Sequence, residues 1–250
     1  MRRIWVEKEI ISEPEFELSG DPFRHAVTVS RLRLGERFQI VCGESQSYIS
    51  ELVSVQKKSA RVRVVDHQPL IEPVAPFVHL ALCLPKWSTF DSVLEKAVEL
   101  GVSSIQPLVS DYSFIKSIND HTRARSERSL KIVKSATEQT GRGKLMEIHE
   151  PTSLKNFVKN FNQRSSAACL FSYEGPSQLD VKTQIQTLKK SMLTDHWLLV
   201  GSEGGFSQEE QQFISQSGFP PATLGKQILR VETACIALIS IIKYELNGCS

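Results

Sequence analysis

The sequence contains few of the features that mark membrane, secreted or metal-binding proteins. None of its apolar runs approaches the roughly 18 residues that a membrane span needs. No long apolar segment follows the charged start Met1–Glu9, as it would in a secretory signal. The five cysteines are odd in number, widely separated and without a C-x-x-C pair, which excludes a disulfide framework and a zinc site. We therefore expect a soluble cytoplasmic protein with no metal.

A strong charge of one sign is also missing. The 250 residues carry 30 lysines and arginines against 28 aspartates and glutamates, a formal net charge of +2, and 40% of them are hydrophobic. This balance excludes a highly charged disordered chain and indicates one large or two modest globular domains. Basic residues nevertheless cluster at Arg24–Arg37 and at Lys57–Arg63. The clusters fit either a solvated protein surface or an anionic partner such as RNA.

Two regions with different patterns follow each other along the chain. Residues 1 to about 70 contain short alternating strands such as Tyr48–Val55, with one short helix expected at about Pro22–Leu32, and this pattern indicates a small β-barrel. Residues 66–76 are rich in proline and lack periodicity, which is typical of a linker. From residue 77 onward strands and helices alternate, which predicts a parallel α/β sheet with its ligand site at the carboxyl ends of the strands.

The strands and helices expected in this second region are short and separated by loops. Buried strands are expected at Phe77–Leu84, Ser104–Val109, Ala167–Phe171 and Trp197–Val200. Helices are expected at about Phe90–Leu100, His121–Thr140, Gln208–Ser217 and Glu232–Leu246. The inner face of the second of these helices is expected to carry Leu130, Val133, Ala136 and Thr137.

The first loop of chemical interest is Leu198–Ser207, where three glycines in five residues lie between a buried strand and a helix. Glycines there let backbone amides approach a ligand closely, because no Cβ intervenes and positive φ is allowed. The loop lacks the ending of a phosphate-binding P-loop and the spacing of a Rossmann fingerprint. A tight strand-to-helix turn, with Ser207 as the N-cap and Glu210 completing a capping box, explains the same residues.

The second loop, Leu224–Ala234, leads from a short strand into the final helix. Glu232 and Thr233 suit a helix N-terminus, whose partial positive charge favours acidic groups. Arg230 places a permanent cation just before that terminus, beside a loop of amides. Taken alone, Arg230 is better explained as a salt-bridge partner than as a catalytic group. The two loops together indicate a functional site more strongly than either loop does alone.

Five segments agree, in order, with one set of family motifs. Gly201–Gly205 matches G-P-E-G-G, and Leu224–Ala234 matches L-G-x-x-I-L-R-T-E-T-A. Glu95–Val102 is similar to Q-K-A-T-E-L-G-V, Glu138–Arg142 to E-Q-S-G-R, and His25–Arg31 to H-x-x-x-V-L-R. In this combination the sequence resembles, over essentially its whole length, the bacterial small-subunit ribosomal RNA methyltransferase E family, which are uridine-N3 methyltransferases of the SPOUT class.

The chain departs from the family pattern at several positions. Ser202 stands where the family has proline, which restores a backbone N–H and frees φ. Val231 stands where the family has threonine, which removes a hydroxyl. Trp87-Ser88-Thr89 replaces a usual glycine and charged residues, and Met146 replaces a proline. We expect these substitutions to affect the affinity for substrate more than the fold.

The resemblance implies a fold, a cofactor and partners. Residues 1–70 would form a PUA-like β-barrel that binds RNA, and residues 77–250 a SPOUT-type α/β methyltransferase domain with a carboxyl-terminal trefoil knot. The cofactor would be S-adenosylmethionine, the partner ribosomal RNA within the small subunit, and the assembly a homodimer. The implied cofactor-binding residues are Leu199, Val200, Gly201, Ser202, Glu203, Gly204, Gly205, Leu224, Gly225, Leu229, Arg230, Glu232, Thr233 and Ala234.

Methyl transfer to uridine N3 needs the reacting atoms held in line and the N3 proton removed. As a hypothesis, Arg230 stabilises the negative charge that develops on the uracil ring. Glu203 or Glu232 orients the base or relays the proton. The candidate RNA contacts are Arg3, His25, Arg31, Arg33, Lys86 and Arg142. Simple surface solvation explains Lys86 and Arg142 about as well, and a structural role explains His25 better.

Two other functions remain compatible with the sequence. A catalytically silent RNA-binding or ribosome-assembly factor of the same fold would account for Ser202 and Val231. A methyltransferase for another RNA position, or for a ribose hydroxyl, would keep the chemistry and change the target. In each case the small net charge limits how much electrostatic attraction can contribute to the affinity for RNA. Shape complementarity and contacts with the bases must supply the rest of that affinity.

Overall fold

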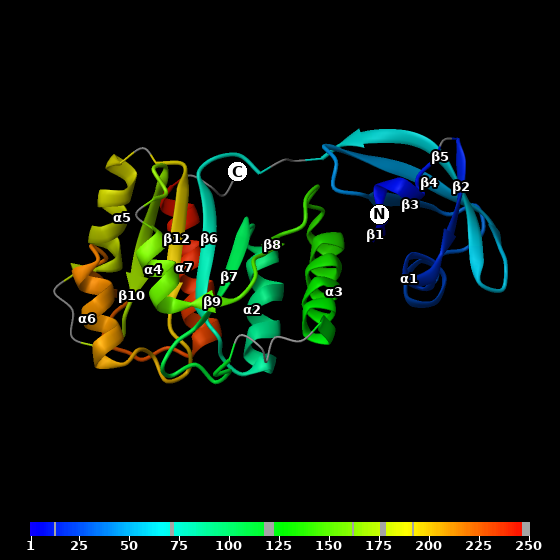
Figure 1. Ribbon diagram of the computed structural model, residues 1–250. Coiled ribbons are helices and arrows are strands. Elements are labelled where there is room, and N and C mark those ends of the chain that lie inside the picture. Colours follow the sequence, from blue (N-terminus) through cyan, green and yellow to red (C-terminus); the bar gives the residue numbers. More distant parts are fainter. Residues whose placement is uncertain are drawn as a thin grey trace. The chain divides into compact units, whose positions relative to one another are not determined.

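The computed structural model describes residues 1–12, 14–70, 73–117, 123–161, 163–175, 179–191 and 193–246. The chain divides into two compact units (Figure 1). The first unit consists of residues 1–72 together with 133–145, and the second of residues 73–132 together with 146–250. Each unit has its own β-sheet, so the expected change from an all-β region to an α/β region is confirmed.

The first unit contains a five-stranded sheet in the order β1-β3-β4-β5-β2. β1 pairs with β3 in parallel and the other neighbours are antiparallel. Alternate residues of the strands, among them Leu18, Phe38 and Val62, are fully buried in one core. The strands are β1 (Arg3–Trp5), β2 (Glu15–Ser19), β3 (Arg37–Val41), β4 (Gln46–Val55) and β5 (Ser59–Pro69), and the helical segments are η1 (Lys8–Ile10), α1 (Gly20–Phe23) and η2 (Arg24–Val29).

Two expectations for this unit need correction. The helix expected to reach Leu32 is a short α-helix followed by the π-helical segment η2, and it ends at Val29 because Arg31 adopts a positive φ of 52° that no right-handed helix accommodates. The linker expected from Asp66 begins later. β5 continues to Pro69, because its last residues pair with Gln46–Ile49 of β4. Sequence periodicity is weak there, whereas cross-strand pairing extends the strand.

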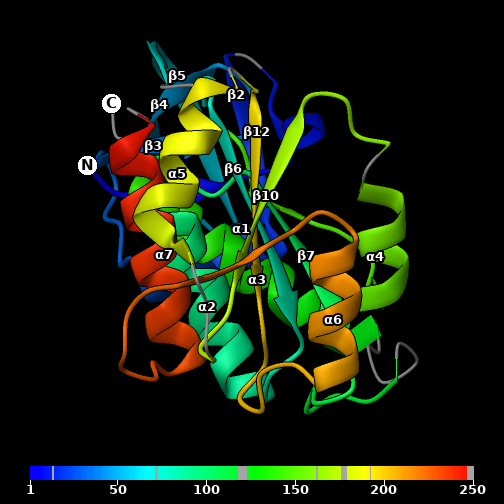
Figure 2. The same cartoon turned by 90° about the vertical axis from the view of Figure 1, so that its left-hand side faces the viewer.

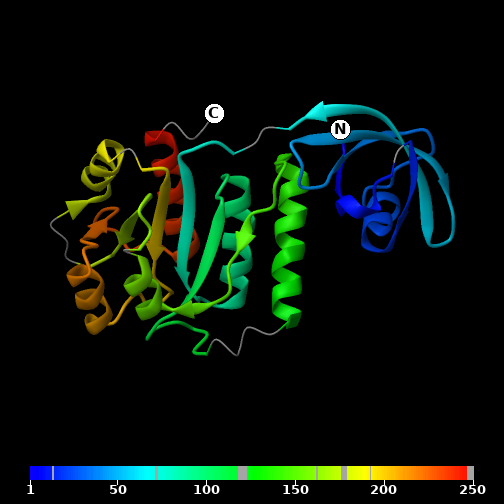
Figure 3. The same cartoon turned by 45° about the horizontal axis from the view of Figure 1, so that its top comes forward.

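The second unit contains an eight-stranded sheet in which β11-β13-β10-β12-β6-β7-β8 are neighbours and β9 also pairs with β7. Every pair is parallel, as the alternating pattern predicted. The strands are β6 (Phe77–Cys83), β7 (Ser104–Val109), β8 (Glu147–Ile148), β9 (Thr152–Ser153), β10 (Ala167–Ser172), β11 (Leu179–Asp180), β12 (Asp195–Val200) and β13 (Pro221–Thr223). Figure 3 shows them as a central layer between helices.

Helices cover both faces of this sheet. Figure 2 shows α2, α5 and α7 on one face and α4 and α6 on the other. Phe157 and Phe161 of α4 pack with Trp197 of β12 and Ile214 of α6 in the core of the second face. The helices are α2 (Trp87–Glu99), α3 (Arg123–Thr140), α4 (Leu154–Phe161), α5 (Val181–Lys190), α6 (Gln208–Gln216) and α7 (Val231–Glu245). The four helices expected from the sequence are confirmed within a few residues, apart from residues 121–122, which lie outside the described residues, whereas α4 and α5 had not been expected.

The buried face of α3 also differs from the expectation at one position. Val133, Ala136 and Thr137 are buried as predicted, but Leu130 is 41% exposed. The buried stripe instead passes through Ser129, which is fully buried and lies four residues before Val133. A leucine one position away points about 100° around the helix from that stripe.

Two histidines on neighbouring central strands are largely removed from water. His79 of β6 stacks on Trp197 with the ring centroids 4.7 Å apart, and its Nε2 lies 3.0 Å from Oδ1 of Asp195. His196 of β12 is 2% exposed. Burial lowers the pKa of both histidines, and the neighbouring Asp195 offsets only part of that effect.

We therefore expect the protein to lose stability as the pH falls below about 6.5, the ordinary pKa of histidine. In that range the unfolded chain binds protons at both histidines while the folded chain resists them, so the free energy of unfolding is highest above that pH. Each histidine contributes a slope of at most about 1.4 kcal/mol per pH unit. Urea unfolding at several pH values measures this slope, and His196→Gln should reduce it. An identical slope in the variant would contradict the assignment.

Candidate active site

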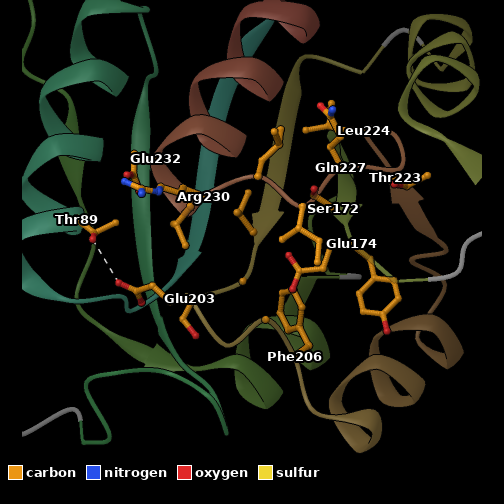
Figure 4. Close-up of a pocket in the computed structure, with 18 of the residues that line it drawn as sticks. Thr89, Ser172, Glu174, Glu203, Phe206, Thr223, Leu224, Gln227, Arg230 and Glu232 are labelled. Carbon is orange, nitrogen blue, oxygen red and sulfur yellow. Dashed lines mark hydrogen bonds between the residues drawn. The ribbon is translucent and has the colours of Figure 1, made fainter.

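A cavity of about 470 Å³ opens at the carboxyl ends of neighbouring strands in the second unit (Figure 4). Its walls come from three segments at these strand ends. They are residues 172–174 at the end of β10, residues 200–203 and 205–206 at the end of β12, and residues 223–224 and 227–232 between the end of β13 and the first turn of α7. Lys86 and Thr89 at the start of α2 complete it. The strand order β13-β10-β12-β6 explains this convergence, because the ends of adjacent parallel strands meet at one edge of the sheet.

The glycine loop after β12 forms a tight turn. The N–H of Gly205 donates to the carbonyl oxygen of Ser202 over 2.9 Å, and Gly205 has a φ of +69°. A Cβ added to Gly201 would lie 3.0 Å from the ring of Phe206 and 3.1 Å from Cα of Gly205. The loop therefore folds against itself closely enough that its peptide groups, rather than side chains, face the cavity at Gly201.

The strand-to-helix turn considered from the sequence is present as well. The hydroxyl of Ser207 accepts from the N–H of Glu210, and the carboxylate of Glu210 accepts from the N–H of Ser207, which completes the predicted capping box. Glu210 is 2% exposed and also accepts the N–H of Asp111 over 2.8 Å. The same loop therefore both lines the cavity and forms the turn into α6, and the capping box fixes the residue at which α6 begins.

Ser202 gives the loop a contact that a proline at this position could not make. Its hydroxyl donates to the carbonyl oxygen of Tyr112 over 2.6 Å, and the residue is 5% exposed. This bond ties the glycine loop to the segment that follows β7. The departure from the family proline therefore replaces a fixed φ with a hydrogen bond to a neighbouring loop.

Glu203 is held by the start of α2. Its Oε1 accepts the N–H of Lys86 over 3.0 Å and the hydroxyl of Thr89 over 3.3 Å, the second of which Figure 4 marks. A carboxylate at the first turn of a helix is stabilised by the unpaired amides there. Glu203 thus joins the glycine loop to α2, which is a positioning role for this carboxylate.

Arg230 lies at the N-cap of α7, where its carbonyl oxygen accepts the N–H of Ala234 over 2.8 Å. Its side chain is exposed and lines the cavity (Figure 4). Within the described ranges, neither its guanidinium nor the carboxylate of Glu232 forms a side-chain hydrogen bond or an ion pair. The salt-bridge partner that a lone arginine would suggest is therefore not found among those residues, and the cation is available to a ligand.

The structure brings most of the expected cofactor-binding residues to the cavity. Those that line it are Val200, Gly201, Ser202, Glu203, Gly205, Leu224, Leu229, Arg230 and Glu232. Those that do not are Leu199, Gly204, Gly225, Thr233 and Ala234. Leu199 is fully buried in the core between the sheet and α4, so its side chain supports the strand rather than a ligand. A Cβ on Gly204 would meet Tyr112 instead of the cavity.

The cavity also has a wall that the sequence reading missed. Ser172 ends β10, and Tyr173 and Glu174 follow it. The carboxylate oxygen Oε1 of Glu174 lies 2.7 Å from where a Cβ on Gly205 would stand. The expectation that ligands bind at strand ends applied to this loop as much as to the other two. The remaining unexpected lining residues are Thr89, Phe206, Thr223, Gln227, Ile228 and Val231.

Of the six candidate RNA contacts, only Lys86 lines the cavity, and its Nζ lies 5.6 Å from the centroid of the Phe114 ring. The other five belong to the first unit. Within that unit Arg31 and Arg33 are exposed, whereas Arg142 is only partly exposed, and burial lowers its pKa. Arg31 and Arg33 therefore remain the more accessible cations.

Arg3 and His25 have structural partners inside the first unit. Arg3 donates to Gln39 Oε1 over 2.9 Å, and Nδ1 of His25 lies 3.0 Å from Oε2 of Glu138. Glu138 is largely buried, accepts the N–H of Trp5 over 2.6 Å, and has a pKa raised by its burial. These contacts favour the structural role for His25.

The described parts of the chain contain no helix long and apolar enough to cross a membrane. They also contain no group of three or more His, Cys, Asp and Glu side chains placed to hold a metal ion.

Comparison with known proteins places the chain among RNA-modifying enzymes. An RNA methyltransferase domain model matches residues 73–243, and an RNA methyltransferase PUA domain model matches residues 18–65. Ribosomal RNA small subunit methyltransferase E of Bacillus subtilis is 27% identical over 255 residues, which cover 98% of this chain and 97% of the relative.

Two solved structures have a similar fold over nearly their whole length. A protein from Legionella pneumophila, described as a methyltransferase and solved with bound SAM, has a TM-score of 0.84 at 28% identity, covering 97% of this chain and 96% of its own. Ribosomal RNA small subunit methyltransferase E from Neisseria gonorrhoeae, bound to S-adenosyl methionine, has a TM-score of 0.83 at 24% identity and covers 98% and 97%, which shows the fold alone. Because the methyltransferase model matches well over half of the sequence, the chain belongs to the RNA methyltransferase family, and its resemblance to ribosomal RNA small subunit methyltransferase E is confirmed.

Proposed function

We propose that this protein transfers a methyl group from S-adenosylmethionine to N3 of a uridine in small-subunit (16S) ribosomal RNA. The observation that carries the proposal is the cavity at the strand ends, which is lined by both Arg230 at the start of α7 and a loop of close-packed glycines. Arg230 has no ion-pair partner among the described residues. Membership of the RNA methyltransferase family supports the same chemistry.

The cavity fits the cofactor in size and in charge. Its volume of about 470 Å³ lies in the range of small-molecule sites. Gly201 lines the cavity with backbone atoms alone, which an adenine or ribose edge can approach. Carboxylates of Glu174, Glu203 and Glu232 face a ligand that carries a sulfonium and an ammonium. When bound, S-adenosylmethionine would supply the methyl group from a positively charged sulfonium, whose sulfur would leave as a neutral thioether.

The side chains of the protein would then make N3 of the uracil reactive. Uridine N3 carries a proton and is a poor nucleophile until that proton leaves. The guanidinium of Arg230 stabilises the negative charge on the uracil ring as the proton departs, aided by the positive end of α7. Glu232, whose carboxylate has no side-chain partner among the described residues, accepts or relays the proton. Glu203 positions the glycine loop through Lys86 and Thr89.

The wider organisation follows the same proposal. Residues 1–70 form the RNA-binding domain, with Arg31 and Arg33 available to phosphates, and residues 77–250 form the methyltransferase domain. The carboxyl-terminal chain of that domain forms a trefoil knot. The protein works as a homodimer in the cytoplasm on ribosomal RNA in the small subunit.

Methylation of unmodified small ribosomal subunits tests the function directly. Purified protein and labelled S-adenosylmethionine are expected to yield 3-methyluridine, located by mass spectrometry of the digested RNA. A methyl group on a ribose hydroxyl or on another base would instead support a different RNA target. No transfer, together with no heat of S-adenosylmethionine binding in a calorimetric titration, would identify a catalytically silent RNA-binding factor.

A further inference from the structure

Two large aromatic side chains stand in water beside the cavity. Tyr112 is 52% exposed and Phe114 is 58% exposed, in the segment that follows β7. The residue between them, Ser113, is 1% exposed. An alternation of exposed aromatic and buried polar residues is the reverse of what packing alone favours, so these rings are not explained by the core of the second unit.

The backbone that carries the two rings is fixed at several points. The carbonyl oxygen of Tyr112 accepts the hydroxyl of Ser202, and the N–H of Phe114 donates to the carbonyl oxygen of Leu84 over 2.9 Å. The hydroxyl of Ser113 accepts the N–H of Ser110 over 2.9 Å. The rings are therefore presented by a backbone that is bound to the glycine loop on one side and to the end of β6 on the other.

The rings also adjoin the rim of the cavity. Lys86, which lines the cavity, places its Nζ 5.6 Å from the centroid of Phe114. On the other side, the carbonyl oxygen of Tyr112 accepts the hydroxyl of Ser202, which lines the cavity, over 2.6 Å. A cation and two exposed aromatic rings thus stand next to the position of the proposed methyl transfer.

We propose that Tyr112 and Phe114 form a stacking surface for an unpaired nucleotide of the substrate RNA next to the methylated uridine, with Lys86 beside its phosphate. The inference rests on the proposed function and names how the substrate is held. N3 lies on the edge of uracil that base pairs use, so the target nucleotide must be unpaired. Turning that base out of the stack frees a face of each adjacent base for stacking on the protein. Aromatic side chains beside cations are the groups that hold unstacked bases.

Alanine variants of the two residues measure the stacking. Tyr112→Ala and Phe114→Ala are each expected to raise KM for small subunits about tenfold, at the lower end of the loss found when a stacking ring is removed. The turnover number and the affinity for S-adenosylmethionine should stay unchanged, because alanine keeps the backbone bonds to Ser202 and Leu84. Tyr112→Phe and Phe114→Tyr should restore KM.

A matched control comes from α7. Tyr244 is 75% exposed and belongs to neither the cavity nor the segment that carries the rings, so Tyr244→Ala should leave KM unchanged. An unchanged KM in both Tyr112→Ala and Phe114→Ala would overturn the proposal. A change in molecular mass by sedimentation in these variants, without a change in KM, would show that the rings contact another protein chain and would also overturn it.

A binding measurement keeps this inference separate from the proposed function. Phe114→Trp places a fluorescent ring on the surface, and a short single-stranded oligouridylate should quench it beyond any quenching of the wild-type protein. Quenching without methylation of small subunits would contradict the proposed reaction and leave the stacking surface intact. Methylation without such quenching would contradict the stacking surface alone.

Discussion

Arg230→Ala is expected to lower the turnover number for methyl transfer by a factor of about 10² to 10³, the loss that follows removal of one preorganised group facing developing charge. The guanidinium lines the cavity, stands at the N-cap of α7 and has no ion-pair partner among the described residues. Removing it would leave the charge on the uracil ring without its nearest permanent cation. Single-turnover methylation of small subunits measures the effect on the chemical step itself.

The controls separate catalysis from binding and from folding. Arg230→Lys keeps the charge but loses the planar fork, so it should retain part of the rate. Because the arginine side chain is exposed and has no ion-pair partner in the part of the chain that the structure describes, neither variant should change the midpoint of urea unfolding by a measurable amount. A calorimetric titration should still show binding of S-adenosylmethionine by Arg230→Ala. If that variant binds the cofactor and turns over at the wild-type rate, Arg230 is not catalytic.

Asp91→Ala should destabilise the protein by about 3 kcal/mol or more, because it removes the carboxylate that pairs with a buried cation. Asp91 lies in α2, and its side chain, 14% exposed, accepts two hydrogen bonds from the guanidinium of Arg125 in α3. The side chain of Arg125 is 10% exposed, and its guanidinium carbon lies 4.3 Å from the centroid of the Trp87 ring. Burial lowers the pKa of Arg125, which reflects the cost of keeping that charge away from water.

The same aspartate provides its own control. Its Oδ2 also accepts from Nε of Arg128 over 2.8 Å, but the side chain of Arg128 is 66% exposed. Arg128→Ala should therefore cost less than about 1 kcal/mol, as exposed ion pairs do. Urea unfolding of both variants measures the difference. Equal losses for Asp91→Ala and Arg128→Ala would show that burial of the Arg125 pair contributes no more to stability than the exposed pair.

Local sequence patterns were sufficient to predict the features that depend on neighbouring residues. The capping box of Ser207 and Glu210, the glycine turn at Gly201–Gly205 and the parallel arrangement of the strands all depend on short-range chemistry or on simple alternation. The two loops expected to form the site do line one cavity. Their meeting follows from the general geometry of parallel sheets, which requires no knowledge of the individual contacts.

Features that depend on distant residues were not predictable in this way. Glu174 reaches the cavity because β10 lies beside β12, and Glu203 binds Lys86 and Thr89 from a position far along the chain. The exposure of Leu130 depends on which side of α3 meets its neighbours. The hydrophobic periodicity of the sequence predicts none of these features, because it depends only on neighbouring residues.

The composition of the first unit was likewise not predictable from local sequence patterns. Composition divides the sequence into one region before residue 70 and another after residue 77. The structure also assigns residues 133–145 to the first unit, where Glu138 accepts the N–H of Trp5 and contacts His25. A helix segment in the middle of the second region can satisfy a backbone amide in the first only through tertiary structure.

The order of the strands has a consequence for synthesis of the protein on the ribosome. β6 pairs on one side with β7, which follows it closely, but on the other side with β12, which is made far later. Chains emerge from the ribosome amino-terminal end first, and an unpaired apolar strand edge invites association with other chains. The edge of β6 therefore stays unpaired until Val200 has emerged. Likewise, the N–H of Trp5 lacks its acceptor until Glu138 has been synthesised. Neither unit can therefore be completed during the first half of synthesis, because each needs residues from beyond position 132.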